Sequence, residues 1–489
     1  MSSVDVAAAY APETEVLRGP GLLESIATVR HSLGFYTAVC CAARFSISSA
    51  ASPGSRTGNA SSTPSIPTLS LLYNALHDVI AQHPPLALGV QDESSPSVRF
   101  VRLSSFDLER LVHVEPLRDE VTRQRALNQL IEARLSTRFG DLEALPLWRL
   151  VVFLPPEAED ASAPGEVDIV LFIHHGIADG GSAVIFMQAL LAAFNAAAAR
   201  QPFEPLGTIV TPPKAALLPS IESLHALPVS FFTLLGMVWR SWFPASRAGL
   251  WTGKPVFRPE DTVQTRHAIR VFPAETAAKL LSAARAHKVT LTPLLEALVA
   301  RALFDSLPDD GHAKRLAASC PINMRAFMPD LKHTIGVFVA SDEHEFVRGG
   351  ADADVWKDAE RLGSQLARTV AYIKQGKHVN TGLLRYMGDM RQNFEKKVGK
   401  PRDRSFEVSN TGSVDGSGGE QGSWSMKQLM FTQSGSITGE ALTFSVSSVR
   451  GGPMTVAVSW VEGVVDEPVV DKTLEKLVSL VNDVCSGKM

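Results

Sequence analysis

Two adjacent histidines, His174 and His175, are the residues of this chain whose type and position most directly suggest chemistry. They follow an apolar run at 167–172, and Asp179 and Gly180 come shortly after them. A neutral imidazole can remove a proton from an alcohol or an amine near pH 7. The pattern therefore predicts a general base at the end of a buried strand, in the turn before a helix at 182–195.

The same residues fit other kinds of site less well. Adjacent strand residues point to opposite faces, so His174 and His175 should not both face one site. A zinc site made of this pair and Asp179 is not expected, because ligands must converge on one point and no nearby Cys or third His completes the set. Residues 180–184 lack the final glycine of a Gly-x-Ser-x-Gly nucleophile elbow. The remaining alternative is two hydrogen-bonded core histidines, which the Asp and two glycines in the turn disfavour.

Four segments resemble a known group of enzymes. The spacing His174-His175-x-x-x-Asp179-Gly180 resembles the motif of the chloramphenicol acetyltransferase-like superfamily, which includes plant BAHD acyltransferases, condensation domains and fungal alcohol acetyltransferases. Residues 18–24 and 30–36 resemble the opening of the fungal alcohol O-acetyltransferase family. Residues 320–325 resemble the superfamily's Asn-x-Arg strand, and 408–412 resemble its Ser-Asn-x-Gly segment. The matches occur in the expected order over most of the chain.

The resemblance implies an α/β fold of mixed sheets, with two similar subdomains and a channel and active site between them. We place the N-terminal subdomain at 1–204, a proline-containing crossover at 205–262 and the C-terminal subdomain at 263–489. Length agrees with this division, because 489 residues are more than one core normally serves.

Hydrophobic periodicity and turn residues predict the elements of both halves. Helices are expected at 21–30, 69–82, 121–135, 182–195, 293–304, 354–374 and 469–484. Strands are expected at 36–45, 146–153, 167–173, 265–272, 317–323, 428–432, 441–449 and 454–462. Thr292 is the expected cap of its helix, with Pro293 first and Glu296 reciprocating. The segments 46–68 and 155–166 are typical of surface loops, and 416–422 of a turn rather than a phosphate loop.

The resemblance also implies a mechanism, in which an acyl group passes from a coenzyme A thioester to a hydroxyl. His175, the second histidine of the motif, would be the general base, a role worth about 10²–10⁴-fold in rate. His174 would face away from the site and pack structurally. This chemistry requires no metal and no bound cofactor, and acetyl-CoA would be a co-substrate.

Asp179 is expected to hold the loop through a salt bridge. The resemblance assigns an arginine as its partner, with Arg325 the first candidate and Arg149 the second. The alternative is that Asp179 orients the imidazole as a triad acid does. Gly180 gives the chain room to turn into the helix. Candidates for oxyanion donors or channel walls, which could equally be ordinary turn or strand residues, are Asn323, Ser409, Asn410, Gly412 and Ser434.

Composition limits the partners and the compartment. The net charge is −4, and no basic run is interleaved with aromatic residues, so nucleic acid is not an expected partner. The four cysteines form no Cys-x-x-Cys pair, and residues 1–25 do not resemble a secretory signal. These features favour an intracellular, cytoplasmic protein, which we expect to be a monomer.

Residues 227–243 are apolar and aromatic but too short for a spanning helix, which needs about 20 apolar residues. They also contain Pro228 and Arg240. We predict a partly buried helix here. The alternative is a helix that lies on a membrane surface, such as that of the endoplasmic reticulum or a lipid droplet, or that lines the acceptor entrance.

The leading hypothesis is an acyl-CoA-dependent O-acyltransferase that moves an acetyl group from acetyl-CoA to an alcohol. The acceptor would be a small alcohol, a terpenoid or another secondary metabolite. One alternative is amide formation or a carrier-bound acyl donor, as in condensation domains. Another is a binding protein of the same fold without turnover, which the intact His175, Asp179 and Gly180 disfavour.

Overall fold

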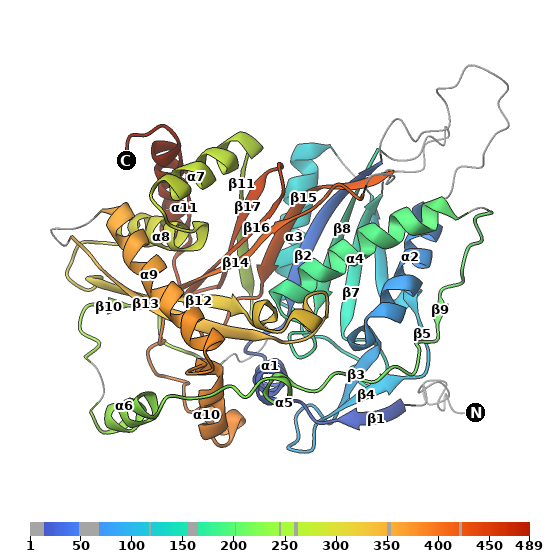
Figure 1. Cartoon of the computed structure of the whole chain (residues 1–489), viewed down its shortest axis with the longest axis horizontal. Coiled ribbons are helices and arrows are strands. Elements are labelled where there is room, and N and C mark those ends of the chain that lie inside the picture. The colour runs from blue at the N-terminus through green and yellow to red at the C-terminus, as the bar shows by residue number, and fades with distance from the viewer. Residues whose placement is uncertain are drawn as a thin grey trace, which may run out of the picture.

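The computed structural model describes residues 14–47, 68–116, 119–154, 165–200, 202–243, 246–258, 263–349, 354–419 and 423–489. The predicted surface loops at 46–68 and 155–166 lie largely outside these ranges. The described part is a mixture of helices and mixed sheets, which confirms the predicted α/β class (Figure 1).

The first large sheet has five strands in the order β15-β2-β8-β7-β6. Its strands are β15 (Trp424–Gln433), β2 (Val39–Ile47), β8 (Glu166–Ile173), β7 (Trp148–Leu154) and β6 (Val112–Pro116). Alternate residues of β2 face opposite sides, as the pleat requires. Cys41 packs with α2 (Thr68–Gln82) and α4 (Gly180–Ala199), whereas Cys40 packs with α3 (Glu120–Leu135).

The second large sheet has the order β10-β12-β14-β16-β17-β11, with β13 also paired to β12. Its strands are β10 (Leu250–Trp251), β12 (Arg315–Asn323), β14 (Phe406–Val414), β16 (Leu442–Val449), β17 (Met454–Val461), β11 (Thr265–Phe272) and β13 (Val339–Val347). The helices that accompany it are α7 (Ala274–Ala286), α8 (Leu291–Ser306), α9 (Val355–Lys374) and α11 (Glu467–Cys485). The buried helix α8 contacts α7, α9 and α11.

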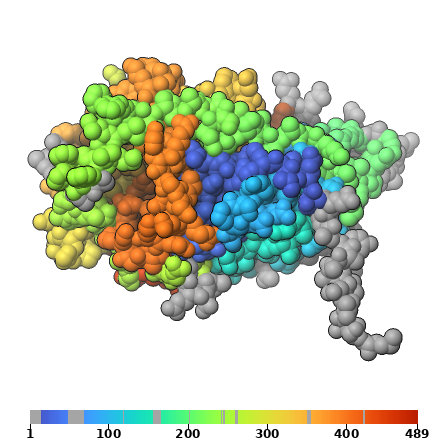
Figure 2. Space-filling model, turned by 90° about the horizontal axis from the view of Figure 1, so that it is seen from below, coloured from blue at the N-terminus to red at the C-terminus, as the bar shows by residue number. Residues whose placement is uncertain are grey.

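Smaller elements lie along one side of the molecule. A three-stranded sheet contains β1 (Thr14–Arg18), β4 (Arg99–Leu103) and β3 (Leu88–Gln91), and β5 (Phe106–Asp107) pairs with β9 (Ile209–Val210). The helices of this side are α1 (Leu22–Ser32), α5 (Ile221–Leu224), α6 (Phe231–Trp242) and α10 (Met390–Glu395). The crossover runs from β9 past α5 to α6, and Figure 2 shows it in green across this face.

The two halves are more closely joined than the predicted boundaries imply. The strand at 424–433 lies in the sequence of the second half, but β15 pairs with β2 along its length, with Phe431 opposite Cys41. Its side chains Trp424, Leu429 and Phe431 belong to the core of the first half. An apolar strand pattern predicts a strand but does not specify which sheet it joins.

Two local predictions about helices differ from the structure. Thr290, not Thr292, is the N-cap of α8, and the Thr290 side chain makes no capping hydrogen bond. Glu296 pairs instead with His344, 2.7 Å away. The helix in 227–243 is more exposed than predicted: Phe232 is 80% exposed and Trp242 77% exposed, and only a minority of its residues, such as Leu234, are half-buried.

Helix α4 is long and apolar enough to span a membrane by composition alone. In the folded chain it is a core helix that packs against α2, β2 and β15. The turn that contains His174 and His175 leads directly into α4. Because α4 is held in the core, the end of this turn is held in place as well. The four cysteines, Cys40, Cys41, Cys320 and Cys485, are all free thiols.

Candidate active site

A cavity of about 370 Å³ lies between the two halves, and His175 is part of its lining. Its lining comes from α1 and the turn after β8 and from β12, β14 and β15. The volume is in the range of small-molecule sites, roughly 300–1,000 Å³. The predicted site between the halves therefore corresponds to a real hollow.

His175 stands just beyond the end of β8. Burial lowers the pKa of His175 to about 4, with the charge of Arg30 acting in the same direction and the residue's own backbone and Asp179 opposing it. Its Nδ1 atom is buried, and no other residue in the described part of the chain hydrogen-bonds to it. The ring is therefore neutral near pH 7, and Nε2 is the nitrogen left to meet a substrate.

Asp179 caps helix α4 and is completely engaged by other groups. Oδ1 accepts the N–H of Ser182 at 2.8 Å, while Oδ2 accepts Arg325 Nη1 and the N–H of Phe338, both at 2.9 Å. Burial alone would raise the pKa of Asp179, but the charge and hydrogen bonds of Arg325 and these N–H groups outweigh it and lower the pKa. The expected Asp179–Arg325 ion pair is thus present.

The structure shows neither a triad-like contact of Asp179 with His175 nor an ion pair of Asp179 with Arg149. Both oxygens of Asp179 are occupied by groups other than His175, so the carboxylate does not orient the imidazole as a triad acid would. Arg149 donates to the carbonyl oxygens of Pro146 and Trp148 rather than to Asp179. Packing favours glycine at position 180, because a Cβ there would lie 2.6 Å from Cζ of Phe431 and the Phe431 ring would have to shift.

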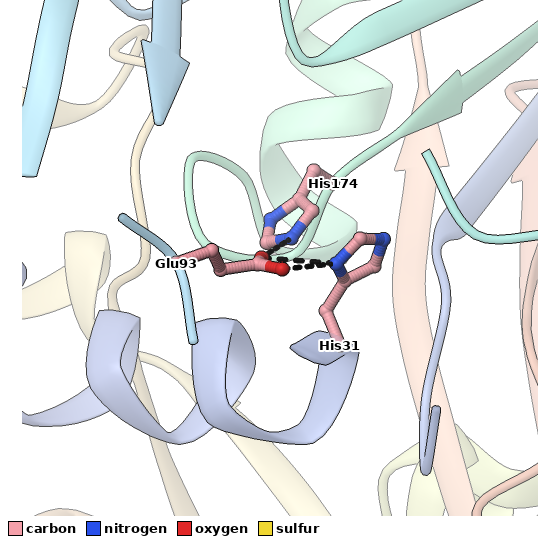
Figure 3. A group of neighbouring side chains, drawn as sticks. All are labelled: His31, Glu93 and His174. Atoms are coloured by element: carbon pink, nitrogen blue, oxygen red, sulfur yellow. Dashed lines mark hydrogen bonds and ion pairs between the residues drawn. The ribbon is translucent and has the colours of Figure 1, made fainter. Parts of the chain in front are cut away.

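His174 points away from the cavity and is fully buried. Its Nε2 lies 3.1 Å from Oε1 of Glu93, and Nδ1 of His31 lies 2.9 Å from the same carboxylate (Figure 3). A third histidine therefore lies near His174, but the group that it forms includes neither His175 nor Asp179. Burial would raise the pKa of Glu93, but hydrogen bonds from His174 and His31 lower it to about 2. Burial also lowers the pKa of His174, to about 4.

The other predicted residues divide into two groups. Asn323, Ser409 and Asn410 line the cavity. The hydroxyl of Ser434 instead accepts the backbone N–H of Thr37 at 3.0 Å, and Ser434 is not part of the lining. Gly412 also lies outside the lining, at a left-handed φ of 83° where the pairing of β14 with β16 shifts register.

Sequence reasoning missed several polar residues of the cavity. The Arg30 guanidinium stacks on the Tyr36 ring at 4.4 Å, and this ring lies 5.5 Å from the His175 imidazole. The Tyr36 hydroxyl donates to Oε1 of Gln433 at 2.8 Å, and Gln433 Nε2 donates to Glu407 at 3.0 Å. Arg30 and Tyr36 lie in a segment that the resemblance had already marked.

Glu407 carries the most unusual carboxyl of the cavity. Burial, followed by the neighbouring charge of Glu440, raises the pKa of Glu407 to about 8. It alternates with Ser409 and Thr411 along β14, and all three line the cavity. The sequence does contain a signal for Glu407. It is a single glutamate in the apolar start of a strand, and it shares one face of that strand with Ser409 and Thr411.

Comparison with known proteins places this geometry in a family. The model of the family described as alcohol acetyltransferase matches residues 122–485, well over half of the chain. A probable alcohol acetyltransferase of Fusarium pseudograminearum, FCK4, is 26% identical over 94% of each chain. The probable alcohol acetyltransferase crmB of Aspergillus fumigatus is 25% identical over 91% of this chain and 95% of that one.

Solved structures show the same fold. The trichothecene 15-O-acetyltransferase TRI3 of Fusarium sporotrichioides matches 96% of this chain and 95% of its own, with a TM-score of 0.65 and 14% identity. The first condensation domain of the calcium-dependent antibiotic synthetase covers 96% of each chain with a TM-score of 0.62 and 13% identity. By the family match, this chain belongs to the alcohol acetyltransferase family and is an acyltransferase.

Proposed function

We propose that this protein transfers an acetyl group from acetyl-CoA to a hydroxyl group of a secondary metabolite, with His175 as general base in a ternary complex. The observation that carries the proposal is the state of His175. It lines the cavity between the halves, and its pKa of about 4 leaves it neutral near pH 7. Its buried Nδ1 leaves Nε2 as the proton acceptor.

In the proposed reaction, Nε2 of His175 takes the proton of the acceptor hydroxyl as that oxygen attacks the thioester carbonyl carbon. The tetrahedral intermediate then collapses, and its carbon–sulfur bond breaks. The imidazolium returns the proton to the departing sulfur, so the products are an ester and free coenzyme A. Asn323 and Ser409, which line the cavity, are the proposed donors to the oxyanion.

The cavity lining supports an acceptor with several oxygen atoms rather than a simple aliphatic alcohol. Polar side chains gather in it, namely Asn323, Glu407, Ser409, Asn410, Thr411 and Gln433. Several of these side chains already pair with one another or with the rest of the protein. Their donors and acceptors form a polar wall, to which a ligand with hydroxyl or carbonyl groups would hydrogen-bond. The TRI3 structure is that of an enzyme named for acetylating a trichothecene, which agrees with a bulky, oxygenated acceptor.

The experiment measures free-thiol release and ester formation from acetyl-CoA with a panel of small alcohols, terpenoid alcohols and polyketide alcohols. The His175→Ala variant should lose about 10²–10⁴-fold in kcat. His267→Ala is the matched control, because His267 is a buried histidine that bonds to Asn128 outside the cavity lining. Unchanged turnover by His175→Ala would disprove the assigned base. Turnover only with longer acyl donors or carrier-bound donors would disprove acetyl-CoA as the donor.

A further inference from the structure

We propose that Glu93 is a positioning residue for His175, and that it acts by fixing the tautomer of His174 in a cluster that works without a metal. The proposal rests on the proposed function, because it assigns Glu93 a task in that reaction. Glu93 lies between β3 and β4, far in sequence from the histidine motif. Figure 3 shows its carboxylate between the rings of His31 and His174.

Backbone N–H groups fix the protonation of both rings. Nε2 of His31 accepts the N–H of Phe139 at 3.0 Å, so this nitrogen carries a lone pair and the proton is on Nδ1. Nδ1 of His174 accepts the N–H of Gly176 at 2.9 Å, so its proton is on Nε2. Each ring therefore donates one N–H to the Glu93 carboxylate, an arrangement in which two neutral imidazoles satisfy one charged acid.

The effect on His175 passes through one peptide group. The N–H that His174 accepts belongs to the peptide between His175 and Gly176, whose other end is the carbonyl of His175. Holding this N–H sets the plane of the peptide and hence the direction of that carbonyl. A hydrogen bond between the His175 ring and its own backbone raises the pKa of His175, in the direction opposite to burial. Within the described structure no other residue hydrogen-bonds to Nδ1, so the ring depends on its own backbone for orientation.

The space around the peptide is equally restrictive. A Cβ on Gly176 would lie 2.9 Å from Nδ1 of His174, so the ring and the peptide are in close contact. The chain of contacts thus runs from Glu93 to the His174 tautomer, to the 175–176 peptide, and to the ring of His175. A change of tautomer at His174 would put two N–H groups face to face and would displace the peptide that carries the base.

The cluster superficially resembles a metal site, because ligand-type atoms of His31, Glu93 and His174 all lie within 4.8 Å of one another. A metal would need lone pairs on the nitrogens that face Glu93. The protons would then move to the nitrogens that face the N–H groups of Phe139 and Gly176, which are donors. Histidines that bind metals normally give their second N–H to an acceptor, so the surroundings of both rings oppose a metal.

The test compares Glu93→Gln, Glu93→Asp and the matched control Glu115→Gln, which changes an exposed residue of β6. In Glu93→Gln one carboxylate oxygen becomes an NH₂ group, and the Nδ1–H of His31, which lies 2.9 Å from both oxygens, would then face a donor. Glu93→Gln should lower kcat by about 10–100-fold, the scale expected for displacement of a reacting group, with the KM for acetyl-CoA unchanged. Glu93→Asp, which keeps the carboxylate, should recover part of the loss.

A second readout does not require activity. Selective ¹⁵N-histidine NMR of the wild type, with His174→Ala for assignment, should show His174 protonated at Nε2 and not at Nδ1 at pH 7. Protonation at Nδ1 would overturn the proposal even if Glu93→Gln failed to fold. Stoichiometric Zn²⁺ binding by the wild type that Glu93→Gln loses would overturn it as well, because a metal requires the opposite tautomers.

The two proposals fail in different ways. If the wild type does not transfer acetyl groups to any alcohol, the proposed function fails while the tautomer of His174 can still be measured. If the wild type is active and folded Glu93→Gln keeps the wild-type kcat, the proposed function stands and the positioning role of Glu93 is disproved.

Discussion

The carboxylate of Asp179 accepts hydrogen bonds from three groups inside the protein, so it should matter more for stability than for chemistry. In Asp179→Asn the Arg325 charge would be left buried without its partner. We expect a loss of about 3–5 kcal/mol in the free energy of unfolding, measured by urea denaturation.

Asp119→Asn is the matched control for this substitution. Asp119 caps α3 through the N–H of Thr122 just as Asp179 caps α4, but it is exposed and pairs with no arginine among the described residues. Asparagine caps a helix as well as aspartate does, so this variant should keep wild-type stability. Equal stability of both variants would contradict the structural role of the Asp179–Arg325 pair.

The low pKa of His175 has a consequence for the pH dependence of the reaction. A base must be unprotonated, and a pKa lowered from 6.5 to about 4 keeps the imidazole neutral at every pH above that value. We expect the acid limb of kcat/KM to fall near pH 4 rather than near pH 6.5. Initial rates at constant ionic strength, with circular dichroism at each pH to exclude unfolding, would check this. An acid limb near pH 6.5 would show that the ring is solvated in the free enzyme.

For individual residues of the site, the sequence predicts those groups that lie close together along the chain. The order of His175, Asp179 and Gly180 is visible directly, and the ion pair with Arg325 followed from the resemblance. The cluster of His31, Glu93 and His174 could not be predicted, because its members are separated by at least 62 positions. Nothing in the local pattern around Glu93 distinguishes it from an exposed loop residue.

Among the elements, α6 is unusual because it presents aromatic side chains to solvent. Phe231, Phe232, Trp239 and Trp242 are each more than 60% exposed. Residues 223–258 contain four Lys or Arg and no Asp or Glu. An exposed aromatic helix in a basic, acid-free segment complements an anionic lipid surface, where aromatic rings favour the interface and cations favour the headgroups.

We therefore predict that the protein floats with phosphatidylcholine vesicles that contain phosphatidylserine, and that Phe232→Glu abolishes this flotation. Val121→Glu, which changes an equally exposed apolar residue of α3, is the matched control and should float like the wild type. Binding that is unaffected by Phe232→Glu would contradict the prediction. An absence of flotation together with dimerisation that Phe232→Glu disrupts would indicate a second copy of the chain as the partner.

Most element boundaries follow from periodicity, and β11 agrees with its predicted range of 265–272. The failures concern what an element packs against. The apolar pattern of 227–243 predicts a helix, but it cannot show that most of the helix stays exposed within the described part of the chain. The cap of α8 was misjudged because Glu296 has a better partner in His344, which comes from a strand 48 residues later.

For the molecule as a whole, the division at 204 separates groups that depend on one another. Without β15, strand β2 would have an unpaired edge, and the first core would lose Trp424, Leu429 and Phe431. We predict that the fragment 1–204 alone does not unfold cooperatively on heating, as followed by circular dichroism.

Co-expression with the fragment 205–489 is the control and should restore a cooperative transition, because it supplies β15. A sharp transition of the isolated fragment 1–204 would show that this half folds on its own. In that case the pairing of β15 with β2 would be an addition to a finished sheet rather than a part of it.

The place of β15 in the first sheet also determines when the site can form during synthesis. Phe431, which packs against Gly180 of the histidine motif, is made 256 residues after His175. At about 5–20 residues per second, the ribosome needs on the order of 13–50 s to add those residues. For that time the histidine motif lies on a sheet in which the edge of β2 has not yet paired with β15, and an unpaired strand edge is a template for aggregation. We therefore expect the nascent chain to be most prone to aggregation after the histidine motif has been made and before β15 has been made.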